Sequence, residues 1–337
     1  MSQDAEQVLA SLKKRAFRPV YFFYGEEPFY IDELTGWMEQ HVLDEAEKGF
    51  NQTVVYGRDV TVRDVIDLAR RFPMSGKYQL IIVKEAQYLQ NMDEPLKAYL
   101  QQPLDTTILV INYKYKKLDR RKALYKILSK SDKCVLFESS KLYDSKIPAW
   151  INHRVLGMGY SINPKSVRLL AEYLGADLGR INNELGKLTI NLQQGEAITE
   201  DLIEQNIGIS KDFNVFELTS AMGKRNIQKA LQIVQYFEAN PKQNPLQMVS
   251  VVVYSYFMKV FLYHFLKNER KTNIASKLGV SPYFVGDYKL AAQNYSPRQI
   301  REIIADLRQL DLKSKGLGAV DAQSYGPLKE LLFKRMS

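Results

Sequence analysis

Short apolar runs alternate with amphipathic segments over the first part of the chain. Five runs are rich in β-branched or aromatic side chains, which is typical of buried strands, and they occupy residues 20–24, 54–56, 80–83, 108–111 and 134–137. After the first run, Ile31, Leu34, Met38 and Val42 recur near helical spacing. Because strands that alternate with helices form parallel sheets, we predict an α/β domain with a mainly parallel sheet covered on both faces.

From about residue 147 onward the pattern indicates helices alone. Asn163 before Pro164 predicts the start of one helix, and Gly175 predicts its end. Thr199 is placed to cap another helix. The second part of the chain is therefore expected to be all-α.

The longest apolar stretch, residues 248–266, is long enough to raise the question of a membrane span. It contains Lys259 and His264, which are costly at membrane depth. Asn244, a proline and Gln247 precede it and predict an N-cap, a first-turn proline and a capping-box glutamine. We therefore expect a buried helix of a helical domain and no membrane contact.

These patterns divide the chain into three regions. Residues 1–143 are expected to form the α/β domain, residues 144–210 a small helical domain, and residues 211–337 a larger helical domain. No internal repeat or low-complexity segment interrupts them.

Composition excludes several classes of protein. With 45% apolar and 25% charged residues the chain has globular proportions, and its net charge is +9. A single cysteine, Cys134, cannot form an internal disulfide, and His41, His153 and His264 are too widely spaced for a Cys/His metal site. The N-terminus is acidic where a signal peptide would be basic, so a cytoplasmic location is expected.

The turn after the first predicted strand lies where a nucleoside triphosphatase has its phosphate-binding loop. That loop requires G-x-x-x-x-G-K-[ST], because its lysine reaches the terminal phosphates and its hydroxyl holds magnesium. When the first glycine of the motif is placed at Gly25, its second glycine, its lysine and its hydroxyl residue fall on Tyr30, Ile31 and Asp32. The lysine and the hydroxyl are both missing.

The strand at 80–83 is not followed by the acidic residues that such a site also needs. It should end in an acid pair, yet Lys84 and Glu85 follow it. The motifs G-x-S-x-G, H-E-x-x-H and C-x-x-C do not occur in the sequence. We therefore expect a degenerate nucleotide site, no catalytic residue, no metal and no cofactor.

Seven short segments carry a resemblance to a known family. They are YFFYGEE at 21–27, FPM at 72–74, KLDRRK at 117–122, LGADL at 174–178, NELGKL at 183–188, NVFEL at 214–218 and IASKLGV at 274–280. In this order they make the chain similar to the delta subunit of the bacterial DNA polymerase III clamp loader, an inactive relative of the AAA+ ATPases. The resemblance implies an AAA+-like parallel-sheet domain, a small helical lid domain and a helical collar domain that joins subunits into a ring.

The same resemblance implies a non-catalytic subunit of the DNA-directed DNA polymerase holoenzyme. Its implied partners are the ring-shaped sliding clamp (beta), the motor (gamma/tau) and delta-prime subunits, and primer-template DNA within the complex. Motor subunits need an intact phosphate loop, and motor and delta-prime subunits typically carry a cysteine-rich zinc module. This chain has neither feature, which favours delta.

In that family a hydrophobic wedge inserts into the clamp and holds one ring interface open. The matching positions are Phe72, Pro73 and Met74, although the commonest family form has leucine where Phe72 stands. A proline at 73 disfavours helical geometry at residue 72, so the apolar pair can project from a turn. The alternative is that Phe72 and Met74 fold back on the sheet as core.

Positive charge is concentrated in residues 113–133, where nine Lys/Arg and two Asp give a local +7. Tyr113 and Tyr115 interleave with lysines, a composition found on nucleic-acid surfaces. The candidates for a contact with DNA or a neighbouring subunit are Lys114, Lys116, Lys117, Arg120, Arg121 and Lys122. The alternative is a solvated helix face.

Two other functions remain open on the sequence alone. Residues 274–290 have the outline of a helix-turn-helix, which would suit a DNA-binding regulator, but the second segment has only Lys289 as a base. A packed helical hairpin is the preferred interpretation. The remaining alternative is a diverged AAA+ ATPase.

Overall fold

The computed structural model describes residues 3–208, 210, 212–314 and 324–336, and it divides into two compact units. Unit 1 comprises Met1–Arg154 and Ala176–Asn182, and unit 2 comprises Val155–Gly175 and Asn183–Ser337. The segment 144–210 is thus shared between the two units. The expected three-domain boundaries remain a prediction.

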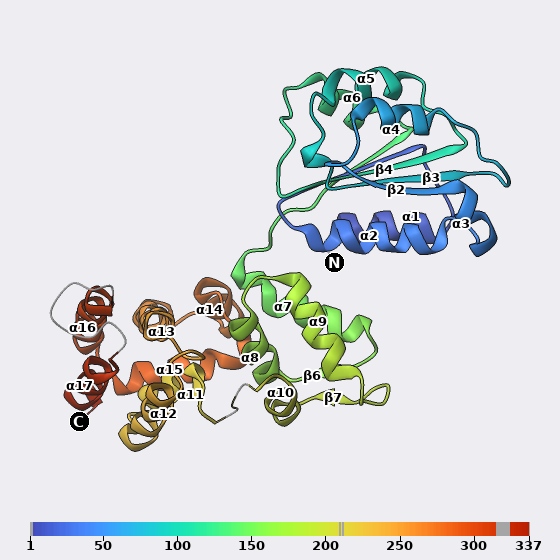
Figure 1. Cartoon of the computed structure of the whole chain (residues 1–337). Coiled ribbons are helices and arrows are strands. Elements are labelled where there is room, and N and C mark those ends of the chain that lie inside the picture. Colours follow the sequence, from blue (N-terminus) through green and yellow to red (C-terminus); the bar gives the residue numbers. More distant parts are fainter. Residues whose placement is uncertain (1–2, 209, 211, 315–323, 337) are drawn as a thin grey trace. The chain divides into compact units, whose positions relative to one another are not determined.

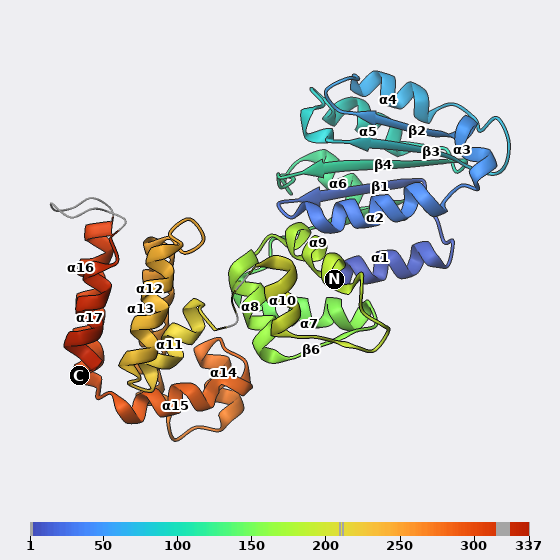
Figure 2. The same ribbon diagram turned by 60° about the horizontal axis from the view of Figure 1, so that its bottom comes forward.

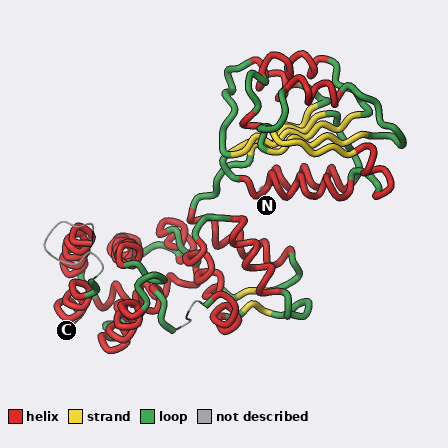
Figure 3. Tube along the Cα trace, viewed as in Figure 1, coloured by secondary structure: helices red, strands yellow, loops and turns green. Residues whose placement is uncertain are grey.

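Unit 1 is built on a five-stranded parallel sheet, drawn in yellow in Figure 3. The strands are β1 (Val20–Gly25), β2 (Gln52–Tyr56), β3 (Gln79–Lys84), β4 (Thr107–Lys114) and β5 (Cys134–Glu138), in the order β2-β3-β4-β1-β5. Every predicted strand is present, and β1, β3 and β4 are buried almost throughout. Their continuous apolar runs fit a sheet with both faces covered.

Helices cover both faces of this sheet, as predicted (Figures 1 and 2). One side carries α1 (Gln3–Lys13) and α2 (Pro28–His41), and the other carries α4 (Val62–Ala69), α5 (Asp93–Gln101) and α6 (Ala123–Lys130). The short α3 (Glu45–Asn51) precedes β2. The hydrophobic core between the sheet and α4, α5 and α6 includes Val65, Ile81 and Leu109.

Two helices are divided between the units: α7 (Ile147–Gly157) after Arg154 and α9 (Leu178–Thr189) after Asn182. Within unit 1, α7 is anchored to α2 because the indole Nε1 of Trp150 donates to the hydroxyl of Tyr30 at 2.7 Å.

The described part of unit 2 is helical, with one exception. Its elements are α8 (Pro164–Leu174), α10 (Glu200–Ile207), α11 (Val215–Gly223), α12 (Ile227–Ala239), α13 (Leu246–Leu266), α14 (Lys271–Leu278), α15 (Val285–Asn294), α16 (Pro297–Ser314) and α17 (Gly326–Met336). The expectation of helices alone is wrong for β6 (Ser161–Ile162) and β7 (Ala197–Ile198), which pair in parallel. Two-residue strands are too short to produce a strand pattern in a sequence.

The predicted caps in this unit are largely confirmed. Asn163 accepts from the amide of Ser166 at the start of α8, and Thr199 accepts from the amide of Leu202 at the start of α10. Gly175 ends α8 with a φ of +68°.

The long apolar helix α13 packs against α16 within the core of unit 2. It is the one helix among the described residues with the length and composition to cross a membrane, and its buried side includes Val253, Phe257 and Val260. The predicted capping by Asn244 and Gln247 is wrong. The side-chain Nε2 of Gln247 donates instead to the carbonyl of Ser314, at the end of α16, at 3.0 Å.

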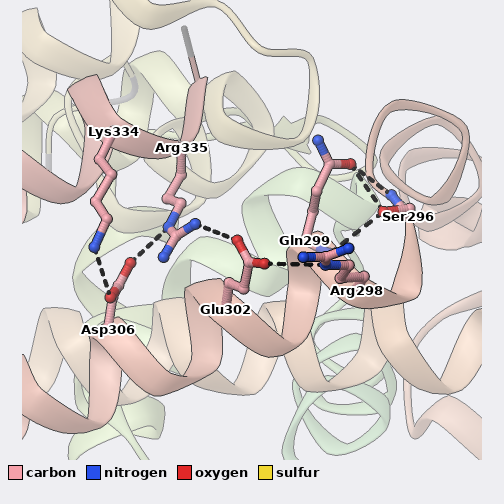
Figure 4. A network of polar contacts seen from close by, with 7 residues as sticks. All are labelled: Ser296, Arg298, Gln299, Glu302, Asp306, Lys334 and Arg335. Atoms are coloured by element: carbon pink, nitrogen blue, oxygen red, sulfur yellow. Dashed lines mark hydrogen bonds and ion pairs between the residues drawn. The ribbon is translucent and has the colours of Figure 1, made fainter.

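Polar contacts join α16 to α17 (Figure 4). The guanidinium of Arg335 donates through Nε to the carboxylate of Asp306 at 2.6 Å and also bonds Glu302. Lys334 adds a second contact to Asp306 at 3.3 Å, and Glu302 lies 3.5 Å from Arg298. These contacts, which we call the clasp, hold α16 and α17 together.

Candidate functional site

The segment after α4 carries the predicted wedge at the surface. The α4 helix begins with a capping box, in which Thr61 and Asp64 bond each other's backbone amides, and its last residue is Ala69. Beyond it, the side chain of Phe72 is 72% exposed and that of Met74 is 79% exposed. Neither side chain belongs to the core, so the alternative in which they fold back on the sheet is wrong.

Three buried polar side chains surround this segment, and none of them was singled out by sequence. They are Asn51 at the end of α3, Gln79 at the start of β3 and Thr107 at the start of β4. Their side chains bond backbone groups on both sides of Pro73. The only available signal was their polar character beside predicted strands, which many surface residues share.

The turn after β1, where a phosphate loop would stand, is closed by the chain's own backbone. Gly25 has a φ of +138°, and a Cβ there would lie 2.0 Å from the carbonyl oxygen of Ser139. The amide of Ser139 donates to the carbonyl of Tyr24 at 2.7 Å, and the amide of Glu27 donates to the carbonyl of Ser139 at 3.1 Å. The turn is thus fastened to the end of β5.

A carboxylate of this turn occupies the amino terminus of α2. Glu27, only 5% exposed, accepts from the amide of Phe29 at 3.1 Å, and Pro28 takes the first helical position. Burial raises the pKa of Glu27, while the bond from Phe29 acts in the opposite direction. A helix amino terminus favours a bound anion, and here the carboxylate of Glu27 accepts a backbone amide at that position.

The remaining predicted nucleotide-site residues are either buried or ion-paired. Tyr30 and Ile31 lie in the core. Lys84 pairs with Glu39 at 2.9 Å. Glu85 follows β3 with a φ of +56°.

Lys114 is the positive group of this site. It is 8% exposed, and its ammonium lies 2.6 Å from Asp32 and 3.3 Å from Glu85. Burial alone would lower the pKa of Lys114, but these two carboxylates outweigh it and raise the pKa. The structure thereby brings together Asp32, Glu85 and Lys114. The two carboxylates balance the positive charge of the lysine inside unit 1.

The other five candidates of the basic segment are exposed: Lys116, Lys117, Arg120, Arg121 and Lys122. Four of them pair with acids. Lys117 lies 3.2 Å from Glu26, Arg120 lies 2.9 Å from Glu138, Arg121 lies 2.9 Å from Asp119, and Lys122 lies 2.7 Å from Asp93. The local charge of +7 is therefore partly balanced by acids from neighbouring elements, a feature that a count along the sequence does not include.

The helix-turn-helix outline corresponds to α14 and α15. Gly279 ends α14 in the left-handed conformation, and α15 follows after a short 3₁₀ turn. Ile274 and Leu278 of α14, together with Val285 and Tyr288 of α15, lie in the core of unit 2. This packing favours the helical hairpin.

Among the described residues, no group of three His, Cys, Asp or Glu side chains could hold a metal ion.

Comparison with known proteins gives concordant matches along the chain. The family "DNA polymerase III, delta subunit" matches residues 21–138, and its C-terminal domain family matches residues 212–324. The DNA polymerase III subunit delta of Bacillus subtilis (strain 168) is 27% identical over 318 residues, which is 91% of each chain.

Solved structures agree with the sequence matches. The DNA clamp loader delta protein of Bacillus subtilis is similar with a TM-score of 0.53 at 26% identity, over 98% of this chain and 99% of that one. A more distant likeness, at 10% identity and a TM-score of 0.37, is to the RuvB Holliday junction branch migration motor of Thermotoga maritima, over 87% of this chain and 85% of that one.

These matches confirm the predicted fold class, an AAA+-like parallel-sheet domain combined with helical domains. They also identify a non-catalytic component of a clamp loader. The chain belongs to the family of DNA polymerase III delta subunits.

Proposed function

We propose that this clamp loader subunit binds the sliding clamp through Phe72, Pro73 and Met74 and holds one interface of the ring open for loading onto primed DNA. The observation that carries the proposal is the exposure of two large apolar side chains, Phe72 and Met74, on a turn whose backbone is bonded to buried polar groups. Exposed apolar side chains grouped in this way mark an interaction site.

The energetics of such a wedge follow from burial. Moving a Phe or Met side chain from water into a pocket contributes roughly 1.5–3 kcal/mol each. Met is flexible enough to fill an irregular pocket, and Pro73 limits the backbone conformations of the turn.

Ring opening requires a difference in affinity between two states of the clamp. A ligand shifts an equilibrium only by binding one state better, and a shift from 1:99 to 99:1 requires about 10⁴-fold tighter binding to the favoured state. The wedge therefore opens the ring to the extent that its pocket is better formed in the open ring. No nucleotide bound by this chain takes part in that step.

The energy of ATP enters through other subunits in this proposal. The cap bond of Glu27 at the amino terminus of α2 and the ion pairs around Lys114 support a degenerate nucleotide site that does not bind a phosphate. We propose that its partners are the motor (gamma/tau) and delta-prime subunits, in the cytoplasmic DNA polymerase III holoenzyme. Lys116, Lys117, Arg120, Arg121 and Lys122 stay candidates for a contact with primer-template DNA or a neighbouring subunit.

The exposed side of α13 is our candidate for the contact with those subunits. Six of its exposed residues are large apolar or aromatic side chains and follow the three- and four-residue steps of a helix-packing stripe: Met248, Val251, Tyr254, Met258, Leu262 and Phe265. A helix face of this kind is normally covered by another helix, so we propose that it lies in the collar formed with other subunits.

The wedge is tested by binding of the purified full-length chain to the sliding clamp of the same organism. The double variant Phe72→Asp, Met74→Asp should bind at least about a hundredfold more weakly, because two carboxylates cannot enter an apolar pocket without a large desolvation cost. Surface plasmon resonance measures the dissociation constant.

The matched control is Phe265→Asp, Met248→Asp, which changes the same residue types at similar exposure on α13. It should bind the clamp like the wild type. Undiminished clamp binding by the wedge variant, or no binding by the wild type, would contradict the proposal.

A further inference from the structure

We propose that Asn51 is the positioning residue that holds the 72–75 turn in its clamp-binding conformation. This inference rests on the proposed clamp binding and adds a residue to it. Asn51 lies outside the turn, on α3, and is only 4% exposed.

The side-chain amide of Asn51 bonds two consecutive residues of the turn. Its Oδ1 accepts from the amide of Met74 at 2.8 Å, and its Nδ2 donates to the carbonyl of Ser75 at 2.5 Å. Because one rigid amide group holds a donor and an acceptor of the backbone, it fixes the orientation of the chain at Met74. One helical turn earlier, Glu47 lies against Gly76, where a Cβ would be 1.8 Å from the carboxylate.

The entrance to the turn is held from the sheet. Thr107 donates to the carbonyl of Ala69 at 2.9 Å, and the side-chain Nε2 of Gln79 donates to the carbonyl of Arg71. Gln79 also donates to Thr107 at 2.7 Å. The bond from Thr107 satisfies the carbonyl of Ala69, one of those that a helix leaves unpaired at its carboxyl end.

The two sets of contacts have different roles. Gln79 and Thr107 are bonded into the sheet, so their loss would disturb the core. Asn51 contacts the part of the turn that carries Met74, and its loss leaves the end of α4 bonded as before. Asn51 is therefore the position at which the conformation of the wedge can be changed with the least effect on the fold.

Positioning affects affinity through the population of the competent conformation. When only a fraction f of molecules has the binding conformation, the apparent dissociation constant rises to Kd/f. A turn freed from Asn51 that adopts the bound geometry about one-tenth of the time would bind the clamp about tenfold more weakly. The contact surface of Phe72 and Met74 would be unchanged.

The experiment uses the full-length variant Asn51→Leu, which keeps the number and branching of the side-chain heavy atoms and removes both bonds. We expect about tenfold weaker clamp binding, and in the free chain at least about tenfold faster hydrogen exchange at the amide of Met74. Exchange at the amides of β3 and β4 should stay at the wild-type rate. The control Asn112→Leu removes the buried bond from Thr35 to Asn112, away from this turn, and should alter neither clamp binding nor exchange at Met74.

A double-mutant cycle separates positioning from general stability. If Asn51 acts through the wedge, Asn51→Leu should weaken binding no further in the Phe72→Asp, Met74→Asp background. Wild-type binding and exchange in Asn51→Leu would overturn the inference while leaving the clamp-binding proposal intact. Wild-type binding in the Phe72→Asp, Met74→Asp variant would overturn the proposed function, and exchange at Met74 would still report whether Asn51 orders the turn.

Discussion

At Gly25 the close approach of the Ser139 carbonyl makes a side chain costly. A Cβ would lie 2.0 Å from that oxygen, at a φ of +138° that side-chain-bearing residues rarely adopt. We expect Gly25→Ala to lower the free energy of unfolding by about 2–4 kcal/mol. Urea denaturation followed by circular dichroism measures this change.

Gly36 is the matched control because it lies within α2, where a Cβ would meet nothing within 4 Å. Gly36→Ala should raise the free energy of unfolding by about 0.5–1 kcal/mol, since alanine favours helix. Equal losses in the two variants would show that the Ser139 contact is not what requires glycine at position 25.

Single residues of the degenerate site were only partly predictable. The missing lysine and hydroxyl after Gly25 could be seen by counting positions, because a phosphate loop has fixed spacing. The pairing of Lys114 with Asp32 could not, because it depends on the register between β4 and α2. For the same reason the sequence predicts Lys114 as a candidate contact with DNA or a neighbouring subunit, and this prediction is wrong because the side chain is buried.

At the scale of elements, the clasp between α16 and α17 depends on Asp306 (Figure 4). Desolvation alone would raise the pKa of Asp306, but bonds from Arg335 and Lys334 outweigh it and hold the pKa below the ordinary value of 3.8. The stabilisation is therefore fully present above that ordinary value and is lost as the pH falls through the lowered one.

We expect Asp306→Asn to lower the free energy of unfolding by about 1–2 kcal/mol at pH 7. The difference from the wild type should begin to shrink as the pH falls below 3.8, where the unfolded chain becomes protonated, and should be lost once the folded-state carboxylate is protonated as well. Urea denaturation at pH 7 and pH 3 measures both effects. Arg298→Gln, at the exposed end of the same network, should cost less than about 0.5 kcal/mol. A cost for Asp306→Asn that is the same at both pH values would contradict this account.

The strands were the elements most visible in the sequence, because buried parallel strands are short and continuously apolar. The α3 helix was not predicted, since its seven residues, EAEKGFN, show no apolar periodicity. With α3 unseen, Asn51 had no structural context and its role could not be inferred. The wedge itself was found only through the resemblance of the FPM segment to a family.

At the scale of the whole molecule, the proposal separates two binding surfaces. The turn at residues 72–74 belongs to unit 1, and the exposed side of α13 belongs to unit 2. We expect Phe265→Asp, Met258→Asp to lower association with the motor and delta-prime subunits at least about tenfold, because both changes put charge on the apolar stripe. Clamp binding should stay at the wild-type value.

Size-exclusion chromatography with the partner subunits measures assembly. The wedge variant Phe72→Asp, Met74→Asp should assemble normally and fail in clamp binding, the reverse of the α13 variant. Loss of both activities in either variant would contradict two independent surfaces.

The carboxylate of Glu27 at the start of α2 has a consequence for timing. Because Glu27 already accepts the amide of Phe29 at this end of the helix, we expect the fold of the subunit not to respond to the ratio of ATP to ADP in the cell. In the proposed function, clamp binding is then controlled by neighbouring subunits that cover or uncover the wedge, so we expect the timing of the loading cycle to be set by the assembly and not by this chain.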